Sequence, residues 1–235
     1  MSWAQSKASA RRLGLLALVS IAAAAPAAAN VLVVRSSGPS AAQYPAGRSL
    51  PDNAQIRLQD NDIVVLLSAG GTRTFRGPGT FSPSQAAGPR VAGNSAGARV
   101  GAVRSAGIDP SMPQPSIWQI DVSQSGTACL TSAASATLWR PDSGEAGRFS
   151  IRGPSGAQQV SWPAGHATAS WPAGLPLATD TEYQISQVGA PVPTTVRVKL
   201  IGAVTGDLTA VADALIRNGC TEQLDLLVAT APERP

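Results

Sequence analysis

From Ser116 onward the chain is divided into short β-type segments, and this pattern limits the folds open to it more than any other feature. The segments are rich in β-branched and aromatic residues, and Gly, Pro, Asp or Ser turns separate them at intervals of about 8–12 residues. Chains of this kind fold as antiparallel sandwiches. Residues 116–203 are therefore predicted to form an antiparallel β-sandwich of the immunoglobulin-like type. Its strands are expected at 117–123, 128–131, 137–140, 147–152, 158–162, 167–171, 182–186 and 194–201.

Residues 30–81 are predicted to form a smaller antiparallel β unit. Its strands are expected at 31–35, 55–59, 63–67 and 72–76. Asp60-Asn61-Asp62 makes a polar turn, so the strands on either side of it are predicted to form a hairpin. The turn could also contact calcium, but no Gly and Glu follow it at the spacing of an EF-hand loop. Because so small a unit buries little surface, we expect it to pack against another part of the chain.

Two further segments differ from the strands in composition. Residues 82–115 consist mainly of Pro, Gly, Ser and Ala, with almost no large apolar residues, and are predicted to be a flexible linker. Residues 204–235 are predicted to be a helical tail, because apolar residues recur there at the period of a helix. The pattern comprises Leu208, Val211, Ala212 and Leu215, with Thr205 or Asp207 as N-cap, Asn218-Gly219 at the end, and a second short helix at 221–229.

The first 29 residues have the composition of a cleavable export signal. A basic start precedes an apolar run that is too short to span a bilayer, and Ala27-Ala28-Ala29 supplies the small residues that a signal peptidase needs. We therefore expect the working chain to begin near Asn30 and to be periplasmic or secreted. No later apolar stretch is long enough to predict a membrane span.

Loss of this signal changes the charge of the protein. The whole chain has 18 Lys and Arg against 14 Asp and Glu, and the basic residues Lys7, Arg11 and Arg12 leave with the signal. The balance becomes 15 to 14, or +1, and no basic cluster with interleaved aromatic residues is present. The sequence therefore argues against a nucleic-acid partner.

Two cysteines remain, Cys129 and Cys220. An even pair in an exported protein favours a disulfide over two buried free thiols. Such a bridge would attach the helical tail to the sandwich.

Two copies of the sequence Trp-Pro-Ala-Gly begin at Trp162 and Trp171. One interpretation is a pair of aromatic platforms that bind a sugar on the surface. The other interpretation, which we favour, is that the two tryptophans close the core at the strand ends of one hairpin with a repeated turn.

Catalytic and metal-binding patterns are weak in this chain. Residues 93–97 match the G-x-S-x-G pattern of a nucleophile elbow around Ser95, with His166 as the only available base and Asp109, Asp121 or Asp142 to orient it. The pattern lies in the predicted linker, without the strand and helix that such an elbow requires. One histidine and two paired cysteines do not make a transition-metal site. We therefore predict no enzymatic activity, no metal and no cofactor.

Residues 48–81 resemble the FecR-like domain of bacterial envelope proteins. The matching stretches are LPDNA at 50–54, DIVVLL at 62–67, GTRT at 71–74 and GPGTF at 77–81. The resemblance implies a small β unit outside the cytoplasmic membrane, and in its best-known members the family relays signals. We expect an exported, non-enzymatic protein that binds another envelope protein or a cell-wall component. The alternatives are a carbohydrate-binding module that uses surface tryptophans and, less favoured, a serine hydrolase.

Overall fold

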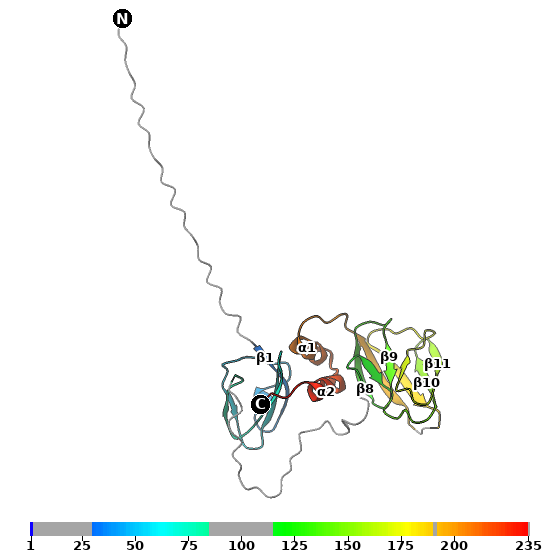
Figure 1. Cartoon of the computed structure of the whole chain (residues 1–235), viewed down its shortest axis with the longest axis horizontal. Helices are drawn as coiled ribbons and strands as arrows, with labels where there is room; N and C mark the ends of the chain where they lie inside the picture. Colours follow the sequence, from blue (N-terminus) through cyan, green and yellow to red (C-terminus); the bar gives the residue numbers. More distant parts are fainter. Residues whose placement is uncertain (2–29, 85–114, 190–191, 235) are drawn as a thin grey trace.

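The structure is a computed structural model that describes residues 1, 30–84, 115–189 and 192–234 (Figure 1). The predicted export signal and residues 85–114 of the predicted linker lie outside the described residues. The fold is mainly β, as predicted, with a smaller N-terminal β unit and a larger C-terminal one. Figure 1 shows α1 and α2 between the two β units.

The N-terminal unit contains two sheets. Four strands form an antiparallel sheet in the order β2-β1-β4-β5, and β3 pairs with β6 in a separate antiparallel sheet. A short 3-10 helix, Ala41–Gln43, follows β1. The strands are β1 (Asn30–Ser37), β2 (Ser49–Pro51), β3 (Ile56–Leu58), β4 (Ile63–Ser68), β5 (Gly71–Arg76) and β6 (Gly79–Phe81).

The four-stranded sheet is buried on both faces. In β1, Val31 and Val33 belong to the core shared with β3, whereas Leu32 and Val34 belong to the core shared with the helices. Strand β4 alternates in the same way between the two cores. Successive side chains of a strand point to opposite faces, so a sheet covered on both sides needs apolar residues at every position. This accounts for the unbroken apolar runs in β1 and β4.

The predicted hairpin between the strands that flank Asp60-Asn61-Asp62 is wrong. Strand β3 pairs with β6, because both edges of β4 are already occupied by β1 and β5. The turn instead ties separate segments together: the buried carboxylate of Asp62 accepts hydrogen bonds from the backbone N–H groups of Ser40 at 2.8 Å and Gln59 at 2.6 Å. Burial raises the pKa of Asp62, but the Ser40 side chain and the two backbone hydrogen bonds outweigh it and leave the pKa below its ordinary value.

The C-terminal unit consists of a five-stranded sheet in the order β11-β10-β13-β14-β8 and a three-stranded sheet in the order β12-β9-β7. Its strands lie within a few residues of the predicted ones. Two pairings, β14 with β8 and β7 with β9, are parallel, so the sandwich is not purely antiparallel. The strands are β7 (Gln119–Asp121), β8 (Gly126–Leu130), β9 (Thr137–Trp139), β10 (Gly147–Gly153), β11 (Gly156–Trp162), β12 (Thr168–Ser170), β13 (Thr181–Gln187) and β14 (Thr194–Leu200).

The two predicted helices are confirmed as α1 (Leu208–Asn218) and α2 (Thr221–Thr230). Asp207 caps α1 by accepting hydrogen bonds from the N–H groups of Thr209 and Ala210, and Gly219 ends it in the left-handed conformation. The apolar stripe of α1 packs against β1 and β4, and Leu224 of α2 belongs to the same core. An ion pair between Arg35 of β1 and Asp225 of α2 also joins the helices to this sheet.

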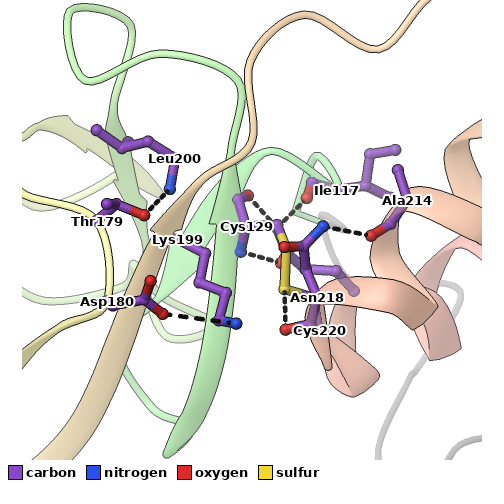
Figure 2. Close-up of a disulfide and its surroundings, with 10 residues drawn as sticks. Ile117, Cys129, Thr179, Asp180, Lys199, Leu200, Ala214, Asn218 and Cys220 are labelled. Atoms are coloured by element: carbon purple, nitrogen blue, oxygen red, sulfur yellow. Dashed lines mark hydrogen bonds and ion pairs between the residues drawn. A yellow bond between two sulfur atoms is a disulfide. The ribbon is translucent and has the colours of Figure 1, made fainter.

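The predicted disulfide between Cys129 and Cys220 is confirmed, with Cα atoms 5.9 Å apart and both residues fully buried. Figure 2 shows that it joins β8 to the chain between the two helices. Beside it, the buried side chain of Gln223 pairs with the edge of β8. Its Oε1 accepts a hydrogen bond from Cys129 N–H at 2.6 Å, and its Nε2 donates to the carbonyl groups of Cys129, at 2.8 Å, and Ile117. One side chain thus substitutes for a neighbouring strand.

Gln223→Leu is expected to lower the free energy of unfolding by about 2–3 kcal/mol. The substitution removes the hydrogen-bond partners of the buried Cys129 backbone groups, and each unsatisfied buried group costs about 1–3 kcal/mol. Urea unfolding monitored by tryptophan fluorescence measures the loss. Glu222→Leu, at an exposed position of the same helix, is the matched control and should change stability by less than about 0.5 kcal/mol. Equal effects of the two substitutions would contradict this role of Gln223.

Candidate functional site

A small polar recess lies beside the β4–β5 hairpin, where segments from both ends of the chain meet. Its volume is about 210 Å³. We call it the arginine recess and define it by its polar and glycine lining. These residues are Asp52, Ser68, Gly71, Arg73, Ser84 and Arg234.

One wall of the arginine recess is formed by residues 232–234, which pair with β5. Thr72 N–H donates to the Pro232 carbonyl at 2.8 Å, and Arg234 N–H donates to the Thr72 carbonyl at 2.8 Å. Gly71 allows this approach: its φ is +122°, and a Cβ there would overlap the Pro232 carbonyl oxygen. The recess therefore exists only when the C-terminal segment lies on the N-terminal sheet.

Two guanidinium groups and one carboxylate set the charge of the recess. Arg73 Nη1 donates to the Pro83 carbonyl at 2.7 Å, which fixes the guanidinium at the wall. Arg234 Nη1 lies 3.3 Å from Ser68 Oγ. The carbonyl of Asp52 accepts hydrogen bonds from Ser84 N–H at 3.1 Å and Ser82 Oγ at 3.1 Å, which hold these two segments of the lining together. The net charge of the lining is positive.

This lining is suited to binding an anionic group. Guanidinium groups present a planar set of N–H donors that matches carboxylate and phosphate oxygens. Pockets for whole small-molecule ligands usually measure about 300–1,000 Å³. The arginine recess is smaller, so it suits the end group of a larger ligand.

The aromatic platform that was the alternative interpretation is not exposed at Trp162. Trp162 is only 1% exposed, packs edge-to-face on Phe149, and donates its indole N–H to the Thr168 carbonyl at 3.1 Å. Trp171 is half-buried against Tyr183, and its indole N–H donates to the Leu175 carbonyl. A sugar platform needs a free ring face, and Trp162 has none, so the structure agrees with the core interpretation.

The two Trp-Pro-Ala-Gly copies do not form one hairpin, contrary to the prediction. Strand β11, which ends at Trp162, pairs with β10, whereas β12 pairs with β9 in the other sheet. The first copy is instead the crossing between the two sheets. Arg140 stabilises it, because its buried guanidinium stacks on Trp162 and donates to the carbonyls of Pro163 and His166.

Among the described residues, no hydrogen bond joins His166 to Asp121 or Asp142, although Gly165 N–H donates to the Ser143 carbonyl at 2.6 Å. Ser95 and Asp109 lie outside the described residues. His166 is exposed in the turn after β11, where its Nδ1 lies 3.1 Å from the Ala164 carbonyl. Asp142 accepts a hydrogen bond from Gly144 N–H within its own loop.

Comparison with protein-family models, with curated proteins and with solved structures finds no match to the chain. Within the described residues, no helix is both long and apolar enough to span a membrane. In the same part of the chain, no three His, Cys, Asp or Glu side chains cluster in a way that could hold a metal ion.

Asp121, at the end of β7, has a carboxyl pKa above its ordinary value, because burial outweighs its hydrogen bonds from Ser123. Because the folded state binds this proton more tightly than the unfolded state, the protonated carboxyl stabilises the fold at a pH below the unfolded-state pKa of 3.8. This stabilisation is lost as the pH rises through the folded-state pKa. Asp121→Asn is therefore expected to increase stability slightly at pH 7 and to leave it unchanged below about pH 3.8. Urea unfolding at several pH values measures this difference. Asp142→Asn, in an exposed loop, is the control, and identical pH profiles for the two variants would contradict the expectation.

Sequence reasoning did not identify Arg73 and Arg234 as site residues. Arg73 lies on a predicted strand and Arg234 near the end of the predicted helical tail, with no motif around either. The only local signal was the unusual Gly70-Gly71 turn, which indicates a close approach of backbone. The segment that approaches Gly71 contains Pro232, which is 161 residues away in the chain, so the sequence did not show which segment it is.

Proposed function

We propose that this protein is an exported, non-enzymatic envelope protein that binds an anionic group of another envelope protein or of a cell-wall component. The observation that carries the proposal is the convergence of Arg73, Arg234 and Ser68 on one small recess. The recess combines segments that are far apart in the chain, with Arg234 on one side of the sequence and residues 31–84 on the other.

Three features support export as part of this proposal. The first 29 residues have the composition of a cleavable signal. The Cys129–Cys220 disulfide is of a kind that persists in oxidising compartments. The FecR-like resemblance of residues 48–81, which include β2 to β6, belongs to the same proposal and favours the periplasm over release from the cell.

Binding is tested with the mature chain, residues 30–235, applied to isolated cell-wall sacculi and to a periplasmic extract. Arg234→Gln should weaken retention at least about tenfold, because a hydrogen-bonded charge contributes about 1.5–3 kcal/mol. Arg217→Gln makes the same substitution at an exposed position on α1 that does not line the recess, and should bind like the wild type. Equal retention of the two variants would remove the recess from the proposal.

Export is tested separately in the source cells. Mass spectrometry of the periplasmic fraction should find a mature N-terminus near Asn30. A chain that remains in the cytoplasm with Met1 or Ser2 at its start would reject the exported part of the proposal.

A further inference from the structure

Strand β11 is an open edge of the five-stranded sheet. It pairs with β10 over seven consecutive residues without a bulge, and its residues from Gly156 to Gln159 are exposed. Figure 1 shows it on the side of the sandwich away from α1 and α2.

The hydrogen-bond pattern shows which backbone groups of β11 face outward. Val188 N–H donates to the Arg148 carbonyl at 2.9 Å, so Arg148 bonds toward β13. Bonding direction alternates along an antiparallel strand, so residues 147, 149, 151 and 153 of β10 bond toward β11. Their partners on β11 are residues 156, 158, 160 and 162. The N–H and C=O groups of Ala157, Gln159 and Ser161 therefore point away from the sheet.

The other strand edges in the described residues are covered or short. Gln223 bonds to the edge of β8, and residues 232–234 bond to the edge of β5. Strands β2, β3, β6, β7 and β12 have three residues each. Proteins usually protect long edges with charges, prolines or bulges. β11 has none of these: its sequence is GAQQVSW.

We infer that β11 pairs antiparallel with β11 of a second copy of this chain, about a twofold axis at Gln159. In this arrangement Gln159 faces its own equivalent, and Ala157 faces Ser161 of the second copy. The outward N–H and C=O groups of these three residues then bond across the axis, and the two sheets become one continuous sheet.

A second copy fits this edge better than a charged partner strand. A twofold axis places each residue beside a residue of the same strand, and β11 carries no charge that would repel itself. The nearest charges on the same face are Arg148 and Arg152 of β10. Three strand spacings, about 14 Å, would separate the two β10 strands. Salt screens charges at that distance, since the Debye length is about 8 Å at physiological ionic strength.

The size of the contact predicts a weak dimer. One strand pair buries less surface than the roughly 1,200 Å² of a stable interface. The arginine recess lies on the N-terminal unit, away from β11, so a dimer would present two recesses to an extended partner.

The experiment is sedimentation velocity of the mature chain from about 1 µM to about 1 mM, a range that covers a weak interface. The wild type should dimerise within this range. Gln159→Lys and Gln159→Glu should each weaken dimerisation at least tenfold, because like charges meet at the axis. An equimolar mixture of the two should dimerise at least as well as the wild type. Circular dichroism checks that each variant is folded.

Gln158→Lys is the matched control. It adds the same charge to the neighbouring residue, which would face Val160 of the second copy, and so should dimerise more strongly than Gln159→Lys. A wild type that stays monomeric throughout, as expected if the edge receives only a peptide from another protein, would overturn the inference. So would a mixture of the Lys and Glu variants that remains monomeric.

Discussion

Replacing Cys129 and Cys220 together by alanine is expected to lower the free energy of unfolding by about 4–5 kcal/mol. The disulfide spans 91 residues, and the chain-entropy model gives a stabilisation of this size for a loop of that length. Domains are usually stable by only about 5–15 kcal/mol, so the variant should lose a large part of its stability. The reason is that the bridge restricts the unfolded chain between β8 and α2.

Urea unfolding of the wild type and the double variant measures this loss. The wild type unfolded in the presence of a reducing agent should match the variant, which separates loss of the bridge from loss of the two sulfur atoms. The control is the substitution Ser155→Ala, at an exposed position in the turn between β10 and β11. A loss below about 1 kcal/mol in the double variant would contradict the expectation.

Trp162→Ala is expected to lower the free energy of unfolding by about 3–5 kcal/mol, the usual cost of removing a large buried aromatic side chain. Trp162 is among the largest fully buried side chains of the sandwich. The change also removes the surface on which Arg140 stacks and leaves the Thr168 carbonyl without its indole donor. Trp162→Phe keeps most of the apolar volume and should cost less.

Thermal and urea unfolding, followed by circular dichroism, measure the effect. Val192→Ala removes an exposed apolar side chain from the same unit and should change stability by less than about 0.5 kcal/mol. If Trp162 were instead a surface platform for a sugar, Trp162→Ala would be as harmless as Val192→Ala. The pair of variants therefore decides between the two roles of this residue.

The two C-terminal helices contact both β units, so we expect the two units to unfold together. Leu215 and Leu224 belong to one core with Leu32 and Leu67 of the N-terminal sheet, while the disulfide holds the same helices on β8. The N-terminal sheet would expose one apolar face without them. Sequence analysis anticipated that this unit needs a packing partner, but the period of the helix did not show which sheet the helix covers.

The elements themselves were predictable because their signals are local. Asp207 and Gly219 mark the ends of α1 within a few residues of its apolar stripe, and turn residues mark the ends of most strands. The disulfide was predictable for a different reason, since two cysteines allow only one pairing within the chain.

The neighbours of each strand depended on packing that no local signal records. The Asp60-Asn61-Asp62 turn indicated a hairpin. However, β4 pairs with β1 and β5 on its two edges, so β3 pairs with β6 instead. The parallel pairing of β14 with β8 brings together segments far apart in the chain, as does the contact that places Arg234 beside Ser68. Turn and capping preferences act over a few residues, whereas strand pairing follows the total apolar surface and hydrogen bonds that the folded chain can bury. The helices and strands could therefore be predicted from the sequence. The arginine recess and the open edge of β11 depend on tertiary packing and could not.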